Sequence, residues 1–131
     1  MSDTPGAMDV RTLYVEDDEV VRELTAELLG EMRLAVTSAG SAAEAISFFD
    51  AAPADAPFEL LVTDIGLPDL PGMDLARQLA ARAPELRIVF SSGYPLPRRP
   101  PGWDGRAASV DKPIDLETPA AVQKELGVDA A

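Results

Sequence analysis

Five short apolar runs divide the chain, and polar or turn-forming residues follow most of them. They span residues 13–15, 34–36, 60–63, 88–90 and 107–110. Apolar runs of this length, bounded by turn residues, are typical of buried strands in a parallel sheet. Stretches with apolar residues at helical spacing lie between them. This alternation predicts an α/β fold in which right-handed crossovers join parallel strands.

The helical stretches carry apolar stripes that we expect to face the core. The first stripe consists of Val21, Leu24, Leu28 and Met32, and the second of Ala42, Ala45, Ile46 and Phe49. Before the second helix, Ser41 is a good N-cap, and Glu44 three residues later completes a capping box. A third helix is expected from about Asp69 or Met73 to Ala83, where Pro84 ends it. A last helix is expected over 119–126, with Thr118 as its N-cap.

Residues capable of chemistry stand at the ends of four predicted strands. They are Glu16 and Asp17, then Asp64, then Ser92, and finally Lys112. The carboxyl ends of parallel strands meet at one edge of the sheet, which is where open α/β sheets bind ligands. Acidic groups there suit a hard cation such as Mg²⁺, and a hydroxyl and a lysine suit phosphoryl oxygens. Asp64 alone could simply cap its own turn, but in this company it is a candidate phosphoryl acceptor.

Over residues 11–114 these motifs resemble the receiver domain of bacterial two-component response regulators. The resemblance implies that Asp64 is the phosphoacceptor and that Ser92 and Lys112 contact the phosphoryl group. It implies a Mg²⁺ site formed by Asp17, Asp64 and the Gly66 carbonyl, with Glu16 acting through water. Asp18 is expected to begin a helix rather than to bind the metal. The Lys112–Pro113 pair resembles the family's Lys-Pro pair, in which the peptide bond is usually cis.

The resemblance also implies an architecture and a partner. The fold would be flavodoxin-like, a doubly wound five-stranded parallel sheet of order 2-1-3-4-5. Residues 1–131 would form one receiver domain with a core of about 9–127. A sensor histidine kinase would supply the phosphoryl group, and the protein would catalyse only its own phosphorylation and dephosphorylation.

The segment 94–106 departs from the receiver pattern, because its prolines are incompatible with a regular fourth helix. A Pro-rich loop is expected instead. Arg98, Arg99 and Arg106 accompany the single Trp103, and Arg and aromatic residues are common at binding hot spots. We therefore interpret this loop as a candidate docking site for a downstream protein.

Three further positions concern the conformational switch and the lifetime of the phosphoryl group. Ser109 stands where receivers usually carry an aromatic switch residue, so Tyr94 is a candidate substitute. The phrase 90–94 resembles the Phe-Ala-Thr-Gly-Tyr signature of a subgroup of single-domain receivers. Gly66 has no side chain to orient water and Tyr94 could cover the site, which together predict slow self-dephosphorylation.

Composition narrows the functional classes. The 131-residue chain has a formal net charge of −12, which argues against a nucleic-acid partner. It contains no cysteine or histidine, which excludes a thiol nucleophile, disulfides and a histidine-ligated zinc site. Its N-terminus does not resemble a signal peptide, and no stretch is apolar enough to span a membrane. A cytoplasmic location without membrane contact is the expectation.

Alternatives from other classes stay open at this stage. A haloacid-dehalogenase-like phosphatase also uses an Asp nucleophile, Mg²⁺, a hydroxyl and a lysine, but it needs a second Asp where this chain has Gly66. A receiver-like module could signal without phosphorylation, and a flavodoxin-like cofactor binder is disfavoured by the acidic edge. If the sequence is the whole protein, residues 114–131 leave room for one final helix and for no effector domain. Output is then expected through protein–protein contacts or as a phosphate shuttle or sink; a domain of a longer protein would have the same sequence features.

Overall fold

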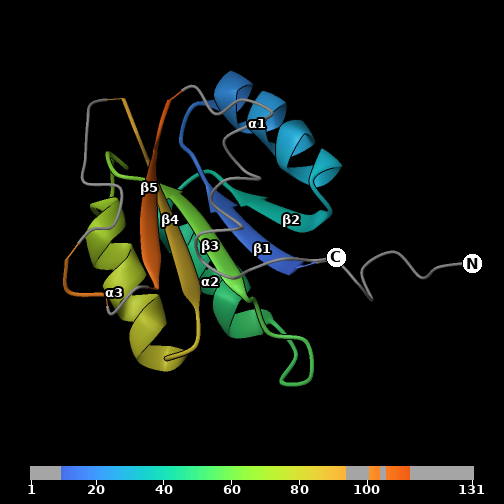
Figure 1. Ribbon diagram of the computed structural model, residues 1–131, viewed down its shortest axis with the longest axis vertical. Coiled ribbons are helices and arrows are strands. Elements are labelled where there is room, and N and C mark those ends of the chain that lie inside the picture. The colour runs from blue at the N-terminus through green and yellow to red at the C-terminus, as the bar shows by residue number, and fades with distance from the viewer. Residues whose placement is uncertain (1–9, 94–100, 104–105, 113–131) are drawn as a thin grey trace, which may run out of the picture.

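The protein is a parallel sheet with helices on both faces (Figure 1). The computed structural model describes residues 10–93, 101–103 and 106–112. The strands are β1 (Val10–Val15), β2 (Leu34–Ala39), β3 (Leu60–Asp64), β4 (Arg87–Ser92) and β5 (Ala107–Asp111). The helices are α1 (Glu19–Glu31), α2 (Ala42–Ala51) and α3 (Gly72–Arg82). The predicted helix over 119–126 and the Lys112–Pro113 bond lie outside the described residues.

The sheet has the order β2-β1-β3-β4-β5, and all four pairings are parallel. This confirms the flavodoxin-like, doubly wound prediction. Buried apolar residues lie on both faces of the sheet. One core contains α2 and α3 residues such as Ala45 and Leu79, and the other contains Leu29 of α1. Because the strands are parallel, their carboxyl ends lie at one edge of the sheet, between the helices that cover its two faces.

The predicted buried stripe of α1 was wrong at two of its positions. Val21 is 38% exposed and Leu24 is 61% exposed, as is their neighbour Val20 at 66%. The buried residues of α1 are instead Thr25 and Leu29. Apolar residues occur on more than one side of this helix, so the helical period alone did not select the buried side.

The second helix begins as predicted. Ser41 is the N-cap, and its hydroxyl accepts a hydrogen bond from the Glu44 amide at 3.1 Å. The Glu44 carboxylate accepts from the Gly40 amide at 2.7 Å, one residue before the cap. Ala42 and Ala45 are buried, and Ile46 and Phe49 pack against the same core. The stripe predicted for this helix is thus confirmed.

Trp103, expected to form part of a docking loop for a partner, is instead a core residue. It is only 4% exposed, and its ring packs edge-on against Phe90 with a centroid distance of 5.7 Å. The Arg77 guanidinium of α3 lies 5.2 Å from the ring centroid. Arg106 donates a hydrogen bond to the Pro84 carbonyl, so this end of the loop is tied to the α3–β4 connection. Residues 101–103 form a turn; the rest of the proposed docking segment, 94–100 and 104–105, lies outside the described residues.

Candidate functional site

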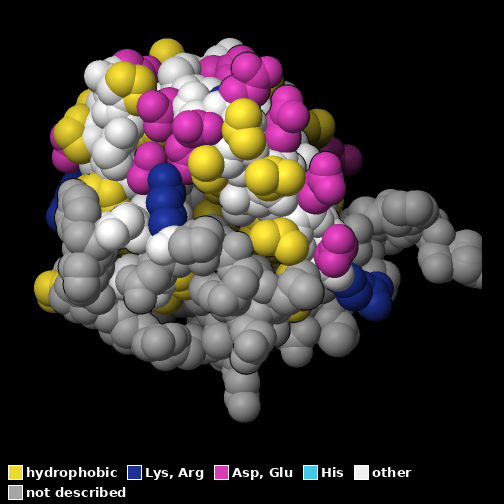
Figure 2. Space-filling view, turned by 90° about the horizontal axis from the view of Figure 1, so that it is seen from above, with side chains coloured by type: hydrophobic (Ala, Val, Ile, Leu, Met, Phe, Trp, Pro, Cys, Tyr) yellow, Lys and Arg dark blue, Asp and Glu magenta, His cyan; other side chains and the backbone are white. Residues whose placement is uncertain are grey.

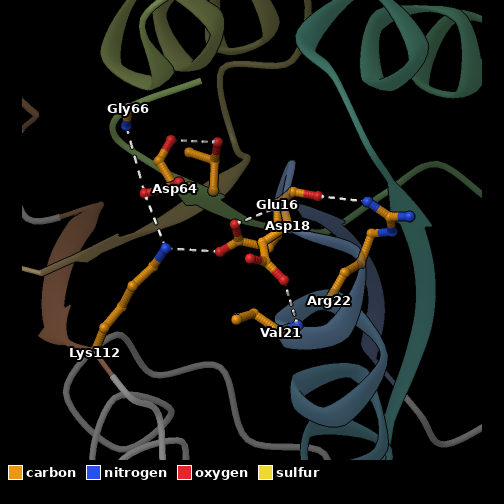
Figure 3. Close-up of polar contacts among 8 residues, drawn as sticks. Glu16, Asp18, Val21, Arg22, Asp64, Gly66 and Lys112 are labelled. Carbon is orange, nitrogen blue, oxygen red and sulfur yellow. Dashed lines mark hydrogen bonds and ion pairs between the residues drawn. The ribbon is translucent and has the colours of Figure 1, made fainter. Parts of the chain in front are cut away.

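Four of the predicted site residues meet at the carboxyl edge of the sheet, and Figure 3 shows Glu16, Asp64 and Lys112 among them. Glu16 and Asp17 follow β1, Asp64 ends β3, and Lys112 follows β5. Carboxylate oxygens of Glu16, Asp17 and Asp64 all lie within 4.8 Å of one another. The strand order explains this convergence, because β3 lies directly beside β1 and only β4 separates it from β5.

The turn after β1 is held by backbone and side-chain bonds. The Glu16 amide donates to the Ala39 carbonyl at 3.1 Å, which extends the β1–β2 pairing into the site. One Glu16 carboxylate oxygen accepts from the Asp18 amide at 3.1 Å, and Arg22 donates to the Glu16 carbonyl at 2.9 Å. Asp18 caps α1 by accepting from the Val21 amide at 3.0 Å, as predicted for a helix-start residue. Asp17, between these fixed neighbours, is exposed and available to a ligand.

Lys112 joins two of the carboxylates. Its ammonium nitrogen lies 2.7 Å from Glu16 Oε1 and 3.3 Å from Asp64 Oδ1. Partial burial works to lower the pKa of Lys112, but the hydrogen bond and charge of Glu16, with the charge of Asp64, outweigh it and leave the pKa above its ordinary value. Lys112 is therefore a stable cation, and its own amide donates to the Ser92 carbonyl at 2.8 Å.

Asp64 occupies a tightly specified position. Its Oδ1 also faces the Gly66 amide at 3.4 Å, and the next amide, that of Ile65, donates to the Ser91 carbonyl at 3.3 Å. The start of α3 presses on its backbone: a Cβ at Gly72 would lie 2.0 Å from the Asp64 carbonyl oxygen. Only glycine permits this approach. The Asp64 side chain is 13% exposed, so it is partly open to solvent at this edge of the sheet.

The donor set fits a hard divalent cation. Three carboxylates and one ammonium give the cluster a formal charge of −2. Its ligand atoms are all oxygens, which Mg²⁺ prefers, and the exposed side at Asp17 leaves room for metal-bound water. Gly66, predicted to add its carbonyl, is exposed and two residues beyond Asp64.

Ser92 is placed at the same edge by the strand register. Ser91 pairs with Asp64, so Ser92 stands one residue beyond it along β4, and Ser92 is buried. Ser109, at the family's usual switch position, is buried beside Phe90, its register partner on β4. Phe90 in turn contacts Trp103, so an aromatic from the loop lies next to the strand that carries Ser92.

Sequence reasoning missed three residues that shape the site. Arg22 donates a hydrogen bond to the Glu16 carbonyl, and Gly72 lets the start of α3 approach the Asp64 backbone. Asp69 accepts hydrogen bonds from the first turn of α2. The Pro71-Gly72 pair is a sequence signal for a turn at Gly72, but it does not indicate which backbone Gly72 approaches. Arg22 and Asp69 had none, because their partners lie in other elements.

Comparison with known proteins agrees with this geometry. The family model of the response regulator receiver domain matches residues 12–97. The chain is 33% identical over 108 residues to the response regulator receiver protein CpdR of Brucella abortus, covering 81% of this chain and 87% of CpdR. It is 40% identical over 88 residues to the transcriptional regulatory protein AruR of Pseudomonas aeruginosa, covering 66% of this chain and 36% of AruR. The chain therefore belongs to the response regulator receiver family, and it spans about a third of AruR.

Solved structures support the same assignment. The receiver domain of the hybrid histidine kinase CckA superposes with a TM-score of 0.69 at 29% identity, covering 88% of this chain and 98% of that domain. The response regulator TrrA of Thermotoga maritima, solved with Mg²⁺ and BeF, superposes with a TM-score of 0.72 at 25% identity, covering 88% of this chain and 98% of TrrA. Within the described residues, no helix is long and apolar enough to cross a membrane.

Proposed function

We propose that this receiver accepts a phosphoryl group from a histidine kinase onto Asp64 in a Mg²⁺-dependent reaction. The observation that carries the proposal is the bridge made by Lys112 between Glu16 and Asp64, with Asp17 alongside. A cation held between a candidate nucleophile and an acidic metal cluster is suited to phosphoryl transfer, which depends mainly on positioning and charge neutralisation.

Each site residue would have a distinct role in phosphoryl transfer. An Asp64 carboxylate oxygen forms the new bond to phosphorus while the bond from phosphorus to the donor breaks, and its electron pair leaves with the donor. Lys112, already 3.3 Å from Asp64, would bind a phosphoryl oxygen, and the Ser92 hydroxyl would bind another. Glu16, Asp17, Asp64 and the Gly66 carbonyl would hold Mg²⁺, which when bound neutralises charge on the phosphoryl oxygens.

The exposed apolar residues of α1 are the surface that we assign to the kinase. Val20, Val21 and Leu24 lie within two turns of Asp18, which adjoins the acidic cluster. Figure 2 shows acidic side chains gathered on one part of the molecule, with exposed hydrophobic side chains among them. A phosphodonor bound at α1 would thus be close to Asp64, and burial of these side chains would add to affinity. Downstream, we propose output through protein contacts or as a phosphate shuttle, in keeping with the match along most of CpdR.

Intact-protein mass spectrometry after incubation with acetyl phosphate tests the proposal. With Mg²⁺ we expect one phosphoryl adduct, and we expect none in Asp64→Asn or with the metal chelated. No adduct on a protein shown to bind Mg²⁺ contradicts autonomous phosphorylation and favours a phosphorylation-independent module. Sustained hydrolysis of p-nitrophenyl phosphate in place of a single adduct would favour the phosphatase.

A second comparison separates the kinase surface from the chemistry. Leu24→Arg changes an exposed side chain, so we expect slower transfer from a phosphorylated histidine kinase and an unchanged rate from acetyl phosphate. Glu27→Gln, at an exposed position of the same helix, raises the net charge by the same single unit and controls for charge. Equal effects of both variants would contradict an apolar contact at Leu24.

A further inference from the structure

The first turn of α2 has an external hydrogen-bond partner. The first amides of a helix have no partner within it and need caps. The Ser41 hydroxyl accepts from the Glu44 amide, and the Ser41 carbonyl accepts from the Ala45 amide at 3.0 Å. The amides of Ala42 and Ala43 are therefore left for an acceptor from elsewhere.

Asp69 is that acceptor, and it comes from the loop that follows the phosphoacceptor. Its Oδ1 accepts from the Ala42 amide at 3.1 Å, and its Oδ2 accepts from the Ala43 amide at 3.0 Å. The bonds from Ala43 and Ala42 hold the pKa of Asp69 below its ordinary value, so the clamp is ionised at neutral pH. The carboxylate also lies at the positive end of the helix dipole. With both oxygens bound, the side chain has a fixed orientation.

The loop 65–71 is fixed at several points around Gly66. Its ends are joined by the bond from the Gly72 amide to the Ile65 carbonyl at 2.8 Å. Leu67 is buried in the core, and Asp69 is tied to α2. Without the Asp69 carboxylate, the part of the loop after Leu67 would lose its two hydrogen bonds to the amides of α2. Gly66 lies on the same short loop, three residues away.

We infer that Asp69 is a positioning residue, which clamps the loop after Asp64 to the N-terminus of α2 and thereby holds Gly66 in place for the divalent cation. This inference rests on the proposed function for the role of Gly66 as a metal ligand. Asp69 does not touch the ion; it acts through the loop. A residue that only capped α2 would affect the stability of the fold and leave the metal site unchanged.

Two measurements on the whole chain test the clamp. Calorimetric titration gives the Mg²⁺ dissociation constant, and amide hydrogen exchange reports the opening of the loop at Gly66 and Leu67. For Asp69→Ala we expect the dissociation constant to rise about tenfold, in the range found when supporting residues of metal sites are removed. We also expect faster exchange at both amides.

Matched variants separate the clamp from capping and from charge. Ser41→Ala removes a cap from the same helix without touching the loop, so it should lower the melting temperature and leave Mg²⁺ affinity unchanged. Asp74→Ala removes an exposed acid from the first turn of α3 and should also leave affinity near wild type. Ala43→Pro deletes one clamp donor while keeping the charge of Asp69. Proline is tolerated in a first helical turn, and this variant should shift affinity in the same direction as Asp69→Ala but less.

Two results would overturn the inference. The first is a lower melting temperature in Asp69→Ala with unchanged Mg²⁺ affinity and unchanged exchange, which would make Asp69 a helix cap only. The second is an equal loss of affinity in Asp74→Ala, which would make the effect one of net charge. If the wild type binds no Mg²⁺, the proposed function loses its metal site. Exchange at Gly66 and Leu67 then still decides whether the clamp exists.

Discussion

Replacing Gly72 with alanine should displace the Asp64 backbone without altering any group that we expect to contact phosphate or metal. The new Cβ would lie 2.0 Å from the Asp64 carbonyl oxygen, 2.9 Å from the Asp64 carbonyl carbon and 3.0 Å from the Ile65 Cα. All three contacts are with backbone, which cannot rotate away as a flexible side chain can. The start of α3 and the end of β3 must separate by about 1 Å to relieve the closest contact.

Two effects of different size follow from that movement. Overpacking of this kind costs about 1–3 kcal/mol of stability. A 1 Å displacement of a reacting group can slow a reaction by about 100-fold. We therefore expect Gly72→Ala to remain folded in dilute buffer but to accept phosphoryl from acetyl phosphate far more slowly. Urea unfolding and the initial rate of adduct formation measure the two effects separately.

Gly30→Ala is the matched control. Gly30 lies in α1, and a Cβ there would meet nothing within 4 Å. Alanine should raise stability by about 0.5–1 kcal/mol through helix propensity and leave phosphorylation unchanged. A wild-type rate of phosphorylation in Gly72→Ala would show that the close approach of α3 does not position Asp64.

The remaining predictions concern the burial of Trp103, the lifetime of the phosphoryl group and the pH dependence of stability. Trp103→Ala should cost about 3–5 kcal/mol in urea unfolding, since it empties a buried site beside Phe90; a loss below 1 kcal/mol would contradict burial. Gly66→Asn has open space for its side chain and can orient water, so the phosphoryl adduct should decay about tenfold faster by timed mass measurement; an unchanged decay would contradict a role of this position in hydrolysis. Burial raises the pKa of Tyr14 from 10.0 to about 12, so its contribution to stability is complete below pH 10 and is lost as the pH rises toward 12. Urea unfolding across that range should therefore show a steeper fall in the wild type than in Tyr14→Phe, and parallel curves would contradict it.

Much of the fold and site was predictable because both follow from local patterns. The apolar runs defined the strands, and the parallel sheet brings their carboxyl ends to one edge, so Asp64, Glu16 and Lys112 could be placed at the same edge from sequence. The ion pairs of Lys112 with Glu16 and Asp64 were not predicted. Ser41 and its capping box are likewise local, and the structure confirms that they begin α2.

Long-range packing was not predictable. In α1, Thr25 is buried and Leu24 exposed, against their hydropathy; Thr25 shares a hydrogen bond with buried Tyr14, which a periodic pattern does not contain. The arginines and prolines around Trp103 in the sequence favoured contact with a partner. Its burial depends instead on Phe90 and Arg77, which lie in distant elements. In each case the deciding contact joins segments that are far apart along the chain.

Locating the phosphoryl group within the phosphorylated chain shows directly whether Asp64 is the phosphoacceptor. The protein would be phosphorylated with acetyl phosphate and Mg²⁺, reduced with borohydride to convert an acyl phosphate to a stable alcohol, and digested for peptide sequencing by mass spectrometry. We expect that Asp64 alone is reduced and that Asp69, which follows it in the same loop, is untouched. Modification at any other residue, or none after an adduct has formed, would contradict this assignment.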